Sequence, residues 1–172
     1  MKRILETERL YLREFTGEDA PLLIDLNSDP EVIRYTGDGP VKDLAEAKRI
    51  INEIILPQYK NAMGRWAVHL KSNDEFIGWC GLKYIADENE IDLGYRFFKK
   101  FWGMGYATES AKACLHYGKN KLRLTRIIAK AAKDNKASIG VIRKLGMVYF
   151  KDDLCAHDPA EVYEYRSDEK NS

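Results

Sequence analysis

Two glycines, Gly103 and Gly105, stand between a predicted strand over 90–98 and a predicted helix over 106–120. Glycine lets the backbone turn its N–H groups inward without a Cβ in the way. The first N–H groups of a helix are unpaired and lie at the positive end of its dipole. Such a turn suits a phosphate or pyrophosphate group, so the segment predicts an anion-binding loop. The plainer alternative is a tight strand-to-helix turn that binds nothing.

The segment is neither a P-loop nor a dinucleotide-binding fingerprint. No Gly-Lys-Ser/Thr follows at the spacing of a P-loop, and the third glycine of the dinucleotide motif is missing. A second cluster of interest, over 134–147, follows the next predicted strand and contains Asn135-x-x-Ser138 and Lys144-Leu145-Gly146.

Together the two clusters resemble the acyl-CoA-binding core of the GNAT superfamily of N-acetyltransferases. Residues 102–107 match the pyrophosphate loop of that family, Gln/Arg-x-x-Gly-x-Gly/Ala, and residues 135–146 match its second motif. The opening stretch over 7–13 and the stretch over 29–32 resemble the RimJ/RimL-like branch, which acetylates the N-termini of ribosomal proteins. The resemblance implies an acetyl-CoA-dependent N-acetyltransferase that needs no metal.

The resemblance also implies which residues bind the cofactor: Arg96, Phe97, Trp102, Gly103, Met104, Gly105, Tyr106, Ala107, Thr108 and Asn135. Two positions depart from the family pattern. Trp102 stands where a Gln or Arg is usual, which removes a cation but leaves every backbone donor. Ile142 stands where many members carry a tyrosine that protonates the leaving thiolate, and in the RimJ/RimL-like branch Ser138 is the substitute candidate.

Acetylation of an amine requires that the attacking ammonium, with a pKa near ~10.4, lose a proton. Glu90 and Asp92 share one face of the strand before the loop and are the candidate bases. One alternative is that both residues belong to the solvated face of that strand. Another is that a water chain carries the proton to a carboxylate, or that the reaction uses no dedicated base. Ser138 has the alternative role of a helix cap. The resemblance places Tyr35 beside the acceptor, a primary amine on a protein N-terminus or on a small molecule such as a polyamine or aminoglycoside.

These residues must be positioned by a mixed α/β fold. Alternating and helical patterns predict a strand and two helices, then a three-stranded meander, then helices alternating with strands. With the resemblance, we expect a GNAT-like, mostly antiparallel central sheet of about six to seven strands with helices on both faces. The chain is predicted to be one acetyltransferase domain over 1–172 with a polar tail from about 167. The predicted strands are 7–15, 65–70, 75–85, 90–98, 127–131, 147–150 and 162–165.

Composition excludes several classes of protein. The 172 residues include 28 Lys and Arg against 27 Asp and Glu, a net charge of +1, which argues against a nucleic-acid-binding protein. No apolar run reaches the length of a membrane span, and no signal peptide is predicted. Three cysteines far apart in the sequence favour a reducing cytoplasm. The oligomeric state, monomer or homodimer, stays open. Competing hypotheses are a non-catalytic acyl-CoA-binding domain and a binding module for another phosphorylated ligand.

Overall fold

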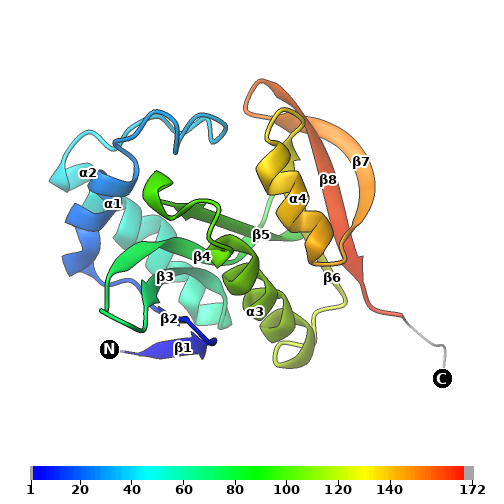
Figure 1. Ribbon diagram of the computed structural model, residues 1–172, viewed down its shortest axis with the longest axis horizontal. Helices are drawn as coiled ribbons and strands as arrows, with labels where there is room; N and C mark the ends of the chain where they lie inside the picture. The colour runs from blue at the N-terminus through cyan, green and yellow to red at the C-terminus, as the bar shows by residue number, and fades with distance from the viewer. Residues whose placement is uncertain (1, 169–172) are drawn as a thin grey trace.

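The computed structural model describes residues 2–168, and an eight-stranded sheet in the order β1-β2-β3-β4-β5-β6-β8-β7 forms its centre (Figure 1). The strands are β1 (Arg3–Glu6), β2 (Leu10–Arg13), β3 (Gly64–Leu70), β4 (Phe76–Ile85), β5 (Glu90–Phe97), β6 (Arg126–Ala132), β7 (Val148–Cys155) and β8 (Asp158–Arg166). The α-helices are α1 (Ala20–Leu26), α2 (Leu44–Ile50), α3 (Tyr106–Asn120) and α4 (Lys136–Lys144). Short helical turns are η1 (Gly17–Asp19), η2 (Ile51–Ile55), η3 (Leu56–Asn61) and η4 (Lys99–Phe101).

Neighbouring strands are antiparallel except for β5 and β6, which are parallel. The mixed, mostly antiparallel sheet predicted from the sequence is therefore confirmed. The strand count is higher than expected because β1 was not predicted, and the predicted strand over 7–15 corresponds to the shorter β2 alone. The chain reverses direction after β1, where Leu10 N donates to the Thr7 hydroxyl at 3.1 Å and Thr7 N donates to Leu10 O at 2.9 Å. A side-chain-assisted turn of this kind leaves no periodic signal in the sequence.

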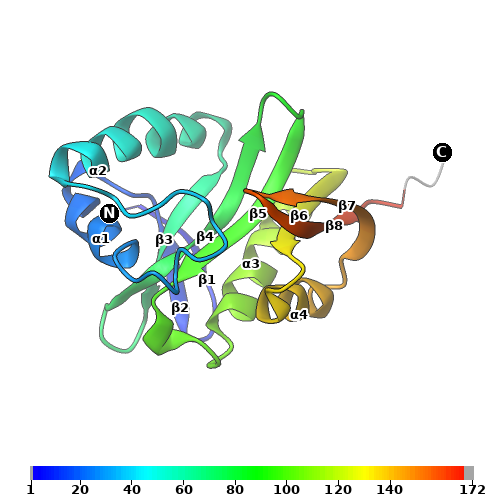
Figure 2. The same ribbon diagram turned by 90° about the horizontal axis from the view of Figure 1, so that it is seen from above.

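Helices cover both faces of the sheet, with α1 and α2 on one side and α3 and α4 on the other (Figure 2). Alternate residues of strand β3 face opposite sides of the sheet. Trp66 and Val68 pack in the core that includes α3 residues such as Cys114, whereas Ala67 packs in the core beneath α1 and α2. Because side chains alternate along a strand, one buried strand serves both cores.

Strand β8 ends at Arg166, directly before the polar tail expected from about 167. Ser167 and Asp168 are described and are not part of any strand, and the rest of the expected tail lies outside the described residues. Within residues 2–168, no helix combines the length and apolar character needed to cross a membrane.

Candidate active site

The site lies where strands β5 and β6 separate. These parallel neighbours share a single register pair, Asp92 with Ile128, although β5 continues to Phe97 and β6 to Ala132. Past Asp92, the edge of β5 therefore has no partner strand among residues 2–168. Free backbone N–H and C=O groups on such an edge can pair with an extended ligand as a neighbouring strand would. Helices α3 and α4 begin just beyond the ends of β5 and β6.

The loop before α3 has the conformation that its glycines predict. Gly103 has φ +72° and Gly105 has φ +83°, both in the left-handed region. The first α-helical hydrogen bond of α3 runs from Glu109 N to Gly105 O at 3.0 Å. The N–H groups of Tyr106, Ala107 and Thr108 precede that bond and remain available for an anion.

Trp102 and Met104 in this loop are exposed, and the Trp102 indole donates to Phe97 O at 2.9 Å. The tryptophan therefore ties the loop to the end of β5. Phe97 itself is buried, so its side chain belongs to the core. The Arg96 side chain turns toward the segment after α1, where it contacts Asn27 and pairs with Asp38 at 2.8 Å. Neither side chain is therefore free to bind a cofactor.

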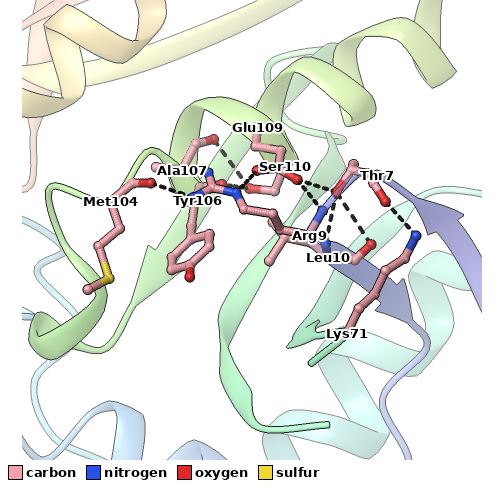
Figure 3. A network of polar contacts seen from close by, with 9 residues as sticks. All are labelled: Thr7, Arg9, Leu10, Lys71, Met104, Tyr106, Ala107, Glu109 and Ser110. Atoms are coloured by element: carbon pink, nitrogen blue, oxygen red, sulfur yellow. Dashed lines mark hydrogen bonds and ion pairs between the residues drawn. The ribbon is translucent and has the colours of Figure 1, made fainter. Parts of the chain in front are cut away.

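A set of polar contacts joins this loop to the start of the chain (Figure 3). The Glu109 carboxylate accepts hydrogen bonds from the Thr7 hydroxyl at 2.6 Å, from Arg9 N at 2.9 Å and from Arg9 Nε at 2.6 Å. Arg9 Nη1 also donates to Met104 O at 2.9 Å, and the guanidinium lies 4.4 Å from the centre of the Tyr106 ring. Burial raises the pKa of Glu109, but the hydrogen bonds from Thr7 and Arg9 outweigh it and leave the pKa below its ordinary value.

Helix α4 presents the second cluster. Asn135 is its N-cap, with the side-chain oxygen accepting from Ser138 N at 3.3 Å. The Ser138 hydroxyl is thus free of capping and lies 3.0 Å from the Tyr95 hydroxyl on β5. Burial raises the pKa of Tyr95 above its ordinary value despite an opposing effect of the Ser138 hydrogen bond, so Tyr95 keeps its proton. Ile142 is buried in the core beneath α4.

Both candidate carboxylates on β5 are ion-paired. Asp92 Oδ2 accepts from Arg65 Nη2 at 2.5 Å, and Glu90 contacts Arg126, which also binds Glu164. Among residues 2–168, Asp92 Oδ1 has no hydrogen-bond partner. Asp92 also lies at the point where β5 and β6 separate, whereas Glu90 lies at the beginning of β5, away from the loop.

Tyr35 lies in the segment between α1 and α2, which reaches the turn between β7 and β8. Its carbonyl oxygen accepts from the Cys155 thiol at 3.1 Å. A Cβ on Gly37 would lie 2.7 Å from the Ala156 side chain, so the segment and the β7–β8 turn are in close contact. The structure thus places the Tyr35 backbone beside the β7–β8 turn.

Tyr95, Thr7, Arg9 and Glu109 were not predicted as site residues. The alternation of β5 could have placed Tyr95 on one face with Leu93 and Phe97, but only the tertiary structure brings it to Ser138. Arg9 and Glu109 are separated by about a hundred positions, and no local pattern connects them. No group of three or more His, Cys, Asp or Glu side chains that could hold a metal ion occurs in the described part of the chain.

Comparison with known proteins identifies a family and a relative that match most of the chain. Residues 9–148 match the family model described as acetyltransferase (GNAT) domain. The uncharacterized N-acetyltransferase p20 of Bacillus licheniformis is 37% identical over 142 residues, 82% of this chain and 80% of that protein.

Two solved structures have the same fold. The crystal structure of a GNAT-family acetyltransferase from Bacillus anthracis superposes with a TM-score of 0.79 at 26% identity, covering 96% of this chain and 98% of that one. RimL, the ribosomal L7/L12 alpha-N-protein acetyltransferase in complex with coenzyme A, superposes with a TM-score of 0.82 at 17% identity, covering 97% and 99%. At 17% identity, the match to RimL is evidence for the fold alone.

Proposed function

The chain belongs to the GNAT family of acetyltransferases and is an N-acetyltransferase, and we propose that it transfers the acetyl group of acetyl-CoA to a primary amine by direct attack of the amine on the thioester. The observation that carries this proposal is the arrangement of the loop before α3 beside the open edge of β5. A pyrophosphate on the loop would direct an extended thiol arm along that edge toward Ser138 and Asp92.

In this proposal the cofactor is bound mainly by backbone groups. The N–H groups from Met104 to Thr108 receive the pyrophosphate, because the two left-handed glycines and the helix start turn them to one side. The backbone of Arg96 and Phe97 pairs with the extended arm. Asn135 uses its side-chain oxygen as a cap, which leaves its amide N–H groups to donate to the cofactor.

The reaction forms a C–N bond and breaks a C–S bond. The amine nitrogen attacks the thioester carbon, and a main-chain N–H on β5 stabilises the negative charge that develops on the carbonyl oxygen. The free Oδ1 of Asp92 takes up the proton from the nitrogen, directly or through water. As the C–S bond breaks, the Ser138 hydroxyl donates to the departing sulfur, with Tyr95 donating to Ser138 in turn. Counted from the neutral amine, the nitrogen loses one proton and the sulfur gains one, so the products are an amide and CoA thiol. The proton that the ammonium loses before the attack goes to solvent.

We propose an N-terminal or small primary amine as the acceptor, approaching from the side of the segment over 27–40. The sequence features at 7–13 and 29–32 support the RimJ/RimL-like branch. Tyr35 and Asp38 lie on this segment, and Asp38 is held by Arg96. We place the reaction in the cytoplasm because the three cysteines are far apart in the sequence, which fits a reducing compartment.

The experiment that tests the proposal measures CoA thiol release from acetyl-CoA with a panel of N-terminal peptides, polyamines and aminoglycosides. Release that depends on one class of acceptor supports the proposal and identifies the class. Titration calorimetry with acetyl-CoA, CoA and ATP is the companion measurement. Tighter binding of ATP than of CoA would contradict the cofactor, and CoA binding without acceptor-dependent release would contradict the transfer.

A further inference from the structure

The loop before α3 carries a negative charge close to the place where a phosphate would bind. Glu109 is in the first turn of α3, and its carboxylate is mostly buried, with an exposed side-chain fraction of 18%. An unpaired carboxylate there would repel a bound phosphate, because like charges near a helix start compete for the same dipole and N–H groups. The side chain that pairs with it comes from the beginning of the chain.

Arg9 binds Glu109 and the loop with one guanidinium group. Nε donates to Glu109 Oε2 at 2.6 Å, and Nη1 donates to Met104 O at 2.9 Å. The two contacts use neighbouring nitrogens of a rigid, planar group, so they fix the distance between the helix start and the loop. Figure 3 shows Arg9 between Met104 on one side and Glu109 on the other.

The contact with Met104 also determines which way the next N–H group points. In a trans peptide the C=O and the following N–H point in opposite directions. Because the Met104 carbonyl points to Arg9, the Gly105 N–H points away from Arg9, toward the open side of the loop. A Cβ on Gly105 would lie 3.3 Å from Arg9 Nη2, so the guanidinium is packed directly against this peptide.

We propose that Arg9 is a positioning residue for cofactor binding: it neutralises Glu109 and holds the Met104–Gly105 peptide with its N–H toward the pyrophosphate. Arg9 thereby supplies, from behind the loop, a cation that Trp102 does not provide within it. This inference rests on the proposed function, since it assumes that the loop receives the pyrophosphate of CoA.

The test compares CoA binding by calorimetry in R9A, R9K, the double variant R9A/E109Q and the control R3A. Arg3 is a matched control, because it pairs with Glu6 at 3.2 Å and lies 4.0 Å from the centre of the Tyr11 ring, but does not contact the loop. We expect the dissociation constant of CoA to rise about tenfold in R9A, as for the loss of a charge-assisted contact. R3A should bind as the wild type does.

R9K and R9A/E109Q distinguish the effect of the Arg9 charge from the effect of its two hydrogen bonds. R9K keeps the charge but cannot bridge two acceptors, so its dissociation constant should fall between those of the wild type and R9A. R9A/E109Q removes the uncompensated carboxylate while keeping an oxygen for the Thr7 hydroxyl, and it should recover at least part of the lost affinity. Recovery in the double variant would assign the loss in R9A to the uncompensated charge of Glu109.

Hydrogen exchange of the ligand-free protein provides a second measurement. The amides of residues 103–107 should exchange faster in R9A, while those of β3 and β4 stay as protected as in the wild type. Equal CoA affinity in R9A and the wild type, an equal loss in R3A, or no recovery in the double variant would overturn the role of Arg9. Failure of the wild-type protein to bind CoA would instead overturn the proposed function, and the inference with it.

Discussion

The hydroxyl groups of Tyr95 and Ser138 lie 3.0 Å apart, which joins strand β5 to helix α4 across the point where β5 and β6 separate. This contact gives Ser138 a role beyond its place in the first turn of α4. Asn135 caps the helix, and the serine hydroxyl is held by a tyrosine that burial keeps protonated. The pair is thus able to donate a hydrogen to a departing sulfur.

Removing the Ser138 hydroxyl should slow turnover without weakening cofactor binding. For S138A we expect kcat to fall about 10²-fold, a typical effect of losing one donor to developing negative charge, with the dissociation constant of CoA unchanged. Y95F should lose less, about tenfold, because the serine donor remains but is no longer oriented. Thiol release under saturating acetyl-CoA measures both.

S138T is the matched control for this pair, since it keeps a hydroxyl and should retain most of the activity. Unchanged kcat in S138A would remove Ser138 from the mechanism. A fall in CoA affinity equal to the fall in kcat would show instead that the serine acts in binding.

Asn135 should affect both stability and cofactor binding. N135A removes the N-cap of α4, which is expected to cost about 1 kcal/mol of unfolding free energy. It should also weaken CoA binding, because the cap holds the helix start beside the cofactor. Urea unfolding and calorimetry provide the two measurements.

Asp43, the N-cap of α2, offers the comparison. Its side chain accepts from Glu46 N at 2.8 Å, and α2 covers the opposite face of the sheet from α4. D43A should lower stability by about the same amount and leave CoA binding unchanged. If N135A binds CoA as tightly as D43A does, Asn135 is only a cap.

The elements around the site were predictable where a local signal marks their ends. The predicted helix over 106–120 coincides with α3, because Gly105 precedes it and its apolar residues recur at helical spacing. The reversal at Thr7 was missed, since it depends on a side-chain hydrogen bond. The order of strands after β5 required the tertiary structure, because β8 comes between β6 and β7.

The candidate site was predictable in its backbone and less so in its side chains. Gly103 and Gly105 predict the loop, because few residues other than glycine adopt such positive φ values readily. The sequence left open whether Ser138 is a helix cap, and only the structure shows that Asn135 is the cap and that the serine contacts Tyr95. The Arg9–Glu109 pair joins distant segments, and no reading of nearby residues could connect them.

Asp92 should matter more for the chemical step than Glu90. D92N removes the acceptor of the amine proton, and we expect kcat to fall about 10²-fold. Asp92 lies at the β5–β6 separation with Oδ1 free, whereas Glu90 shares Arg126 with Glu164 at the beginning of β5. Thiol release by D92N and E90Q, each with its unfolding curve, decides between them. A large loss of thiol release in E90Q alone would assign the role of base to Glu90. Full activity in both variants would indicate that water accepts the proton.

The buried pair of Arg13 and Asp19 should make the protein sensitive to acid. Arg13 donates to both carboxylate oxygens of Asp19, at 2.7 and 2.8 Å, and the two side chains are only 6% and 10% exposed. Burial raises the pKa of Asp19, but the bonds from Arg13 and Thr16 outweigh it and hold the pKa below its ordinary value. The unfolded chain therefore binds this proton more readily than the folded protein does. The resulting stability is fully present above about pH 4 and is lost as the pH falls toward the folded-state pKa.

Urea unfolding between about pH 7 and pH 2 in the wild type, D19N and E18Q tests this expectation. D19N should lose about 3 kcal/mol at neutral pH, as when one partner of a buried pair is removed, and its stability should fall less steeply below about pH 4. His69, which accepts from Arg13 Nε at 3.1 Å, contributes in a separate window, because burial lowers its pKa and its protonation costs stability below about pH 6.5. Glu18 is the exposed neighbour of Asp19, and E18Q should follow the wild-type curve. Equal acid slopes for D19N and the wild type would show that the pair does not control acid unfolding.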